Sequence, residues 1–237
     1  MAAKEIKVAV VTGNHPYDVQ GFHQLFRSLS GIDAYIQHMD NYAATPDSIG
    51  LAVDNDFEPG KARESYDVLL FFSMISGEPT DEGLRWFQGK PKSALANVGE
   101  TGQGIFLMHH AVLQYSKWPV WDEIVGIPKG RTEGFKYTMD EKIGVEVANA
   151  NHPITKGMKA FEVIDEAYMM PDADAGQGNE ILLRTENANS MKTLAWTRQY
   201  KKSRVFCTPL GHDKLVWDHP SFRQLTQRAI EWCANKI

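Results

Sequence analysis

Short apolar runs recur along the chain, and they predict strands that are covered on both faces. The runs are IKVAVVT (6–12), YDVLLFF (66–72), GIFLMHH (104–110) and SRVFCTPL (203–210). Unbroken stretches rich in Val, Ile and Phe are typical of a parallel sheet. A further strand is predicted over AYIQHMD (34–40), which ends on a polar residue, as strands that feed a binding crevice often do.

Between these strands the apolar positions follow a helical period. One helix face after the first strand consists of Phe22, Leu25, Phe26 and Leu29. A second helix is predicted over 80–89, because Thr80 is an N-cap candidate followed by acidic residues. A closing helix is predicted by the stripe of Phe222, Leu225, Ala229, Trp232 and Cys233. Strands that alternate with helices predict an open, doubly wound α/β fold with right-handed crossovers.

Residues 127–200 break this alternation with strand-like pieces that are separated by Pro, Gly and Asn. The pieces are GVEVA, FEVIDEAYMM, EILLRTE and TLAWTRQY. We therefore expect a β-rich insertion over the carboxyl edge of the sheet, where ligands bind in such folds. A chain of 237 residues, 43% of them hydrophobic, suits a single domain (1–237) that carries this insertion.

Composition narrows the classes of partner. The formal net charge is -5 and no basic run exceeds Lys201–Lys202, which argues against nucleic acid. The apolar runs are far shorter than the roughly 20 residues that span a bilayer, and the N-terminal residues do not resemble an export leader. Two cysteines, Cys207 and Cys233, make no disulfide framework. These features favour a cytoplasmic protein with small-molecule partners, either alone or as a homo-oligomer.

Histidines follow three of the predicted strands. His15 comes after the first strand, His109 and His110 after the central one, and His212 after the last. Because the carboxyl ends of parallel strands meet at one edge, we expect these histidines to lie together. A single histidine at a strand end is more often structural, so it is the shared edge that makes them candidates for chemistry.

Two further elements carry candidate residues. In VIDEAY, strand alternation sends Glu166 and Tyr168 to the same face. A carboxylate beside a histidine fixes its tautomer and raises its basicity, as acid–base catalysis and metal binding both require. In AWTRQY, Arg198 is a candidate to hold a carboxylate or sugar hydroxyls, and a surface strand charge is an equally good interpretation.

Several of these segments resemble the trehalose-utilisation ThuA-like family. They are GQGIFLMHHAV, NHPITKGM, VIDEAYMM, LAWTRQYKKSRVFCTPLGHD and VWDHPSFRQLTQRAIEWC. The resemblance runs from the first strand to the last helix. It implies a flavodoxin-like, mainly parallel sheet related to the class I glutamine amidotransferase-like superfamily.

In class I amidotransferases a cysteine occupies the sharp turn after the central strand, and a histidine follows a later strand. The resemblance puts His109 in the place of that cysteine and His212 near the place of that histidine. Imidazole cannot supply the thiolate that acyl transfer needs, and Cys207 lies inside a strand. Amidotransferase chemistry is therefore disfavoured. The family often has a further histidine after the central helix, whereas GRTEGFKYTM offers Arg131, Lys136 and Tyr137.

The resemblance implies a sugar-derived ligand, such as a 3-keto intermediate of disaccharide utilisation, and three hypotheses remain open. The first is a hydrolase, lyase or isomerase that acts on a sugar or keto-sugar by acid–base chemistry. Its candidate catalytic residues are His109, Glu166 and His212. Its candidate substrate-binding residues are His15, His110, Tyr168 and Arg198.

The second hypothesis is a divalent metal site, with zinc as the candidate ion. Its candidate ligands are His15, His109 and His212, with Glu166 as an oxygen donor. No HxxxH or HExxH spacing supports it locally. The third hypothesis is a non-catalytic sugar-binding module that keeps an amidotransferase-like fold without its nucleophile.

Overall fold

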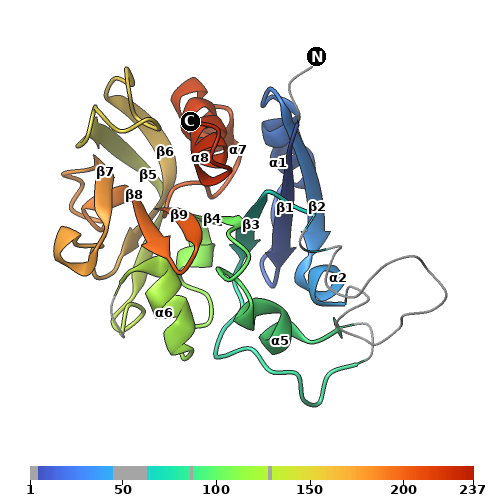
Figure 1. Ribbon diagram of the computed structural model, residues 1–237. Coiled ribbons are helices and arrows are strands. Elements are labelled where there is room, and N and C mark those ends of the chain that lie inside the picture. The colour runs from blue at the N-terminus through green and yellow to red at the C-terminus, as the bar shows by residue number, and fades with distance from the viewer. Residues whose placement is uncertain (1–4, 45–62, 64, 86–87, 128–129) are drawn as a thin grey trace.

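The structure is a computed structural model that describes residues 5–44, 63, 65–85, 88–127 and 130–237. In this part of the chain a nine-stranded sheet has the order β2-β1-β3-β4-β9-β8-β7-β5-β6. Helices lie on both of its faces (Figure 1). The fold is therefore the mixed α/β class that the sequence predicts.

Five strands form the parallel part of the sheet. They are β2 (Ile32–His38), β1 (Ile6–Gly13), β3 (Val68–Ser73), β4 (Gly104–Met108) and β9 (Ser203–Thr208). The four apolar runs and the further strand predicted over 34–40 are thus confirmed as strands. The run over 104–110 ends as a strand at Met108, so the two histidines that follow lie beyond its carboxyl end.

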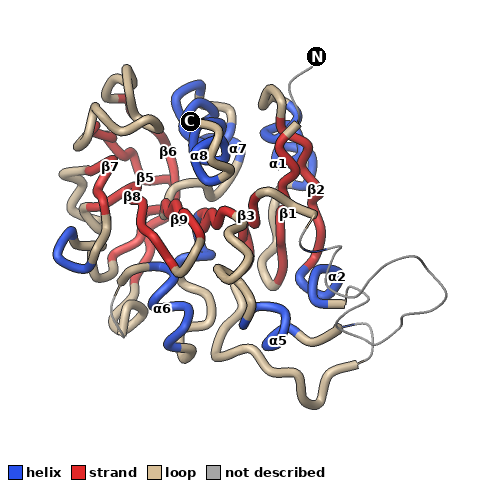
Figure 2. Tube along the Cα trace, viewed as in Figure 1, coloured by secondary structure: helices blue, strands red, loops and turns tan. Residues whose placement is uncertain are grey.

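The helices cover the sheet in two layers, which Figure 2 shows in blue around the red strands. Side chains alternate along β1 and so contact both helix layers: Val8 and Val10 face one layer, whereas Ala9 and Val11 face the other. The first layer comprises α1 (Val19–Arg27), α7 (Lys214–Trp217) and α8 (Pro220–Cys233). The second comprises α2 (Met39–Ala43), α5 (Pro91–Ala96) and α6 (Pro119–Val125). The predicted first and closing helices are confirmed as α1 and α8.

The helix predicted over 80–89 is wrong for residues 80–85, which form bends and coil. The hydroxyl of Thr80 accepts a hydrogen bond from the backbone N–H of Glu82 at 3.1 Å, which closes a local turn. The carboxylate of Asp81 instead accepts hydrogen bonds from the N–H groups of Lys92 and Ser93 in the first turn of α5. Thr80 therefore closes a turn, and Asp81 binds the start of a later helix.

Four strands make the antiparallel part of the sheet. They are β8 (Thr193–Tyr200), β7 (Glu180–Arg184), β5 (Lys136–Val147) and β6 (Phe161–Met169). A 3-10 turn, η3 (Ala175–Gln177), precedes β7. The β-rich segment expected over 127–200 is thus an extension of the same sheet. Its strand β6 packs against α7 and so reaches the carboxyl ends of the parallel strands.

Among the described residues, no helix combines the length and the apolar character needed to cross a bilayer.

Candidate functional site

A sharp turn follows the central strand β4 and carries His109. The backbone of His109 has φ of 55°, in the left-handed region that residues other than glycine seldom adopt. His109 is the first residue of a single 3-10 turn, η2 (His109–Val112). Residues in such conformations often belong to functional sites, where the surrounding structure maintains the strain. The ring of His109 is fully buried.

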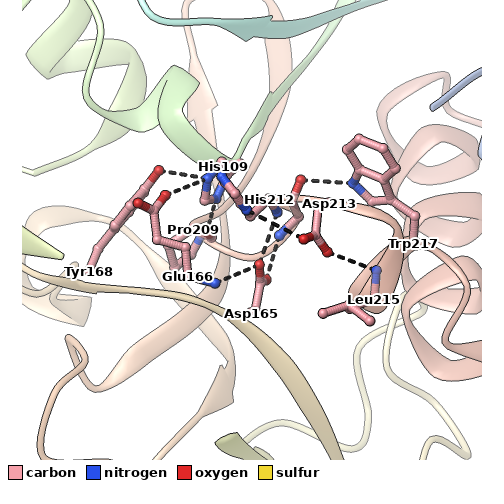
Figure 3. A network of polar contacts seen from close by, with 10 residues as sticks. His109, Asp165, Glu166, Tyr168, Pro209, His212, Asp213, Leu215 and Trp217 are labelled. Atoms are coloured by element: carbon pink, nitrogen blue, oxygen red, sulfur yellow. Dashed lines mark hydrogen bonds and ion pairs between the residues drawn. The ribbon is translucent and has the colours of Figure 1, made fainter. Parts of the chain in front are cut away.

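Three partners fix this ring (Figure 3). The Nδ1 atom lies 2.7 Å from the carbonyl oxygen of Pro209. Because a carbonyl only accepts, Nδ1 carries a proton and donates it. The Nε2 atom lies 3.0 Å from Oε2 of Glu166 and 2.7 Å from the hydroxyl of Tyr168. A hydrogen bond between Nε2 and the carboxyl group needs a second proton, which the pair of His109 and Glu166 shares.

The charges of this group follow from its burial and its partners. Burial alone raises the pKa of Glu166, but the hydrogen bond and positive charge of His109 lower it, and the net direction is downward. Burial, together with the charge of Glu166, raises the pKa of Tyr168 well above its usual value. At neutral pH the site therefore holds a carboxylate on Glu166 and a protonated hydroxyl on Tyr168.

Asp165 joins β6 to the loop after β9. Its carboxylate accepts hydrogen bonds from the backbone N–H groups of Gly211 at 2.7 Å and of His212 at 2.9 Å. It also accepts one from the N–H of Glu166 at 2.9 Å. Burial outweighs these bonds and raises the pKa of Asp165. Asp165 is thus a positioning residue for His212, a role that the sequence analysis missed. Strand alternation does indicate that the side chain of Asp165 points away from that of Glu166, but it does not indicate which loop it meets.

The four candidate histidines meet at the carboxyl edge, as the sequence predicts, and we call them the histidine cluster: His15, His109, His110 and His212. The ring of His15 stacks on that of His110 with centroids 4.4 Å apart and an interplanar angle of 28°. His212 presents its ring edge to His15 at 6.1 Å and to His109 at 5.3 Å. The rings of His109 and His110 are 5.0 Å apart.

His110 occupies the interior of this cluster. Burial, with repulsion from His109 and His15, holds its pKa far below the usual value, although the nearby carbonyl of Phe72 acts in the opposite direction. Neither ring nitrogen makes a hydrogen bond of standard geometry to any described residue. His110 is therefore neutral and packs behind His15. Burial also lowers the pKa of His15.

A cavity of about 280 Å³ opens beside the cluster. Its lining residues are His15, Met74, Leu113, Phe135, Tyr137, Met139, Glu166, Tyr168 and His212. His109 and His110 do not line it. A ligand in the cavity would therefore meet the carboxylate of Glu166, with His109 behind it.

Arg198 lies elsewhere, in a separate cavity of about 320 Å³ that is also lined by Gly126 at the end of α6. Its Nη1 atom donates to Oδ1 of Asn179 at 3.1 Å. Trp196, two residues earlier on β8, faces the same way and donates to the carbonyl of Val125 at 2.8 Å. Alternation therefore directs Arg198 toward α6, and the structure does not bring it to the histidine cluster.

The stretch after α6 supports the site in two ways. Arg131 is buried and pairs with Asp122, and its Nε atom donates to the carbonyl of Val112 in η2 at 3.0 Å. Burial lowers the pKa of Arg131 to about 10. Tyr137 lines the cavity, whereas Lys136 is exposed. Arg131 thus holds the turn that carries His109.

The site also has the composition of a metal centre. Among the described residues, ligand atoms of His109, Glu166 and His212 lie within 4.8 Å of one another. The Nδ1 hydrogen bond to Pro209 leaves Nε2 of His109 as the ligating nitrogen, an arrangement common in metal sites. Two imidazoles and a carboxylate suit zinc or a similar ion. The fourth ligand candidate of the sequence analysis, His15, is not part of this group.

Comparisons with known proteins agree with this fold. Residues 8–233 match a family model described as ThuA, trehalose utilisation. A ThuA-like protein from Parabacteroides merdae superposes with a TM-score of 0.67 at 20% identity, over 98% of this chain and 90% of that chain. A ThuA-like protein from Bacteroides uniformis gives 0.66 at 17% identity, over 98% and 93%.

A glutamine amidotransferase from Thermotoga maritima superposes with a TM-score of 0.50 at 9% identity, over 97% of this chain and 98% of that chain. A comparison of the sequence with curated proteins found no significant match. At these identities the structural likeness shows the fold and leaves the chemistry to be argued from the site.

Proposed function

Because the chain belongs to the ThuA family, described as trehalose utilisation, we propose that it is an enzyme that acts on a keto-sugar by proton transfer at Glu166. The observation that carries this proposal is the 3.0 Å contact between Oε2 of Glu166 and Nε2 of His109 beside the cavity. A carboxylate that reaches a cavity, with an imidazole partner behind it, can accept and return a proton.

The reaction that suits these groups is elimination from a 3-keto-glycoside. A hydrogen on the carbon next to a ketone is acidic enough for a carboxylate to remove. Glu166 takes this proton, and the electrons of the C–H bond form a carbon–carbon double bond. The bond from the anomeric carbon to the glycosidic oxygen breaks, and that oxygen takes the electron pair and a proton from His212. Addition of water to the double bond completes a net hydrolysis.

The neighbouring residues have distinct roles in this proposal. His109 is a positioning residue, because it is buried and acts through the carboxylate of Glu166. His15 and Tyr168 line the cavity and orient the ligand. His110 packs the cluster from behind. The absence of a cysteine at the turn after β4 argues against acyl transfer.

Turnover of keto-glycosides by the purified protein tests this proposal, with Glu166→Gln as the isosteric variant. We expect this variant to lose about 10²- to 10⁴-fold in kcat, the usual contribution of a general base. Glu162→Gln is the matched control, because Glu162 is exposed on the same strand and pairs with Lys142. Wild-type turnover by Glu166→Gln would overturn the proposal. Binding of keto-glycosides without turnover by any form would leave a non-catalytic sugar-binding module.

A divalent metal is the second candidate, favoured by the grouping of His109, Glu166 and His212. A bound ion would act as a Lewis acid that polarises the ketone of the substrate. Elemental analysis of protein purified without a histidine tag tests this candidate. If the metal hypothesis is correct, the wild type should contain one ion per chain and Glu166→Gln should lose that ion. Turnover of substrate by protein that lacks stoichiometric metal would contradict this hypothesis.

We further propose a cytoplasmic protein with a small sugar ligand. The support is that Cys207 and Cys233 are free, buried thiols, as a reducing compartment favours. Fractionation of the cells that express it, with blotting for the chain, would check the compartment.

A further inference from the structure

The outer part of the cavity is apolar. Three of its lining side chains are well exposed, with relative accessibilities of 61% for Tyr137, 46% for Met139 and 36% for Met74. The polar lining residues are more buried, since the carboxylate of Glu166 and the hydroxyl of Tyr168 lie at the contact with His109. The cavity therefore has a polar inner end and an apolar mouth.

A row of rings connects these two ends. The ring of Tyr168 stacks on His109 with centroids 4.8 Å apart and an interplanar angle of 26°. Phe135 meets Tyr168 edge to face at 5.2 Å, and Tyr137 stacks on Phe135 at 6.3 Å and 26°. Flat aromatic surface thus leads from the reacting groups to the solvent.

The mouth offers little to a second sugar or to an anion. Among the described lining residues there is no Lys, Arg, Asp, Asn or Gln. A second sugar ring at the mouth would place hydroxyl groups against Met and aromatic side chains, where polar groups lose hydrogen bonds to water without replacement. A phosphate would find no permanent cation there.

On this basis, and resting on the proposed function, we propose that the site takes glycosides with a flat, apolar, aromatic aglycone. The sugar ring lies inward against Glu166 and His212, and the aglycone lies outward against Tyr137, Met139 and Met74. Stacked and edge-on contacts between aromatic rings contribute binding free energy in addition to that from the buried apolar area. Methionine side chains adapt to such rings and make favourable contacts between sulfur and the ring.

Leaving-group chemistry alone could also favour aryl substrates, because a phenolate leaves more readily than an alkoxide. That effect changes kcat, whereas contacts at the mouth change binding. Glucosides that have not been oxidised carry no ketone, so Glu166 has no acidic hydrogen to remove from them. Their equilibrium affinity therefore reports the mouth contacts by themselves.

The experiment is titration calorimetry with phenyl glucoside, methyl glucoside and trehalose, using both anomers of each glucoside. We expect the wild type to bind one phenyl anomer about tenfold or more tightly than its methyl counterpart, from the apolar area of the ring. Trehalose should bind more weakly than that phenyl glucoside. Tyr137→Ala should weaken phenyl glucoside binding about two- to tenfold and leave methyl glucoside binding unchanged.

Ile164→Ala is the matched control, because Ile164 is an apolar residue of the same hairpin, 45% exposed, that does not line the cavity. It should leave all affinities at the wild-type values. Equal affinity for phenyl and methyl glucosides, or an unchanged phenyl affinity in a folded Tyr137→Ala protein, would overturn the inference. Selective phenyl binding without turnover of the corresponding keto-glucosides would instead reject the proposed function and leave the aryl-binding mouth standing.

Discussion

The Nε2 atom of His109 and the Oε2 atom of Glu166 lie 3.0 Å apart, although the two residues are 57 positions apart in the chain. The other ring nitrogen of His109 is bound to the carbonyl of Pro209. This arrangement fixes the orientation of the imidazole and directs its Nε2 atom toward Glu166 and Tyr168. His109 therefore holds the carboxylate of Glu166 through its Nε2 atom.

Replacement of His109 should change the pH dependence of the carboxylate. The hydrogen bond and charge of His109 bring the pKa of Glu166 below 4.5, against the opposing effect of burial. A base must be ionised, so wild-type activity should fall with acid only below this value. In His109→Asn the two largest lowering causes are removed, whereas burial and the smaller effects of His212 and Tyr168 remain, so the acid limb should move to higher pH. Asn is chosen because it tolerates a positive φ better than most residues.

The pH profile of kcat/KM measures this shift, and His23→Asn on α1 is a control outside the cavity lining. Stability should follow the same sign. A depressed carboxyl pKa in the folded state stabilises the protein above about pH 4.5, and this contribution is lost as the pH falls through the folded value. An acid limb that stays in place in His109→Asn would show that His109 does not set the charge of Glu166.

Asp165→Asn should weaken the attachment of the loop after β9. The carboxylate accepts three backbone hydrogen bonds, and an amide would place a donor against at least one of those N–H groups. We expect the free energy of unfolding to drop by about 1–3 kcal/mol. Because the loop carries His212, kcat should fall while KM changes little. Urea unfolding and steady-state kinetics give both numbers, and wild-type values for both would refute the positioning role.

Arg198→Ala should leave catalysis intact. The side chain lines the cavity at α6 and donates to Asn179, away from the histidine cluster. Loss of this contact should cost about 1 kcal/mol of unfolding free energy, with kcat/KM within twofold of the wild type. Arg131→Ala is the informative contrast, because Arg131 holds the carbonyl of Val112 beneath the turn of His109. A large rise in KM for Arg198→Ala would contradict this prediction and show that Arg198 contributes to substrate binding.

The sequence predicts most of the parallel half of the fold and part of the site. Strands covered on both faces are apolar at several consecutive positions, so β1, β3, β4 and β9 are visible as runs. The rule that parallel strands share a carboxyl edge then brings His15, His109 and His212 together. The strands are thus predicted from the local sequence pattern, and the grouping of the histidines from the shared carboxyl edge of parallel strands.

The remaining features depend on long-range packing. Alternation places Trp196 and Arg198 on one face of β8, but only the position of α6 decides which face that is. The role of Asp165 depends on the approach of β6 to the loop after β9, which no local pattern encodes. Likewise, Asp81 caps α5 from eleven residues away, so its helix-start pattern predicts a helix in the wrong place.

The central claim is that Glu166 removes a proton next to the ketone of a keto-sugar. Proton NMR in deuterium oxide measures this step directly, as loss of the hydrogen on the carbon beside the ketone of a keto-glycoside. We predict rapid loss with the wild type and with Glu162→Gln, and loss slowed about 10²- to 10⁴-fold with Glu166→Gln. Loss of that hydrogen at the wild-type rate in Glu166→Gln would contradict the account.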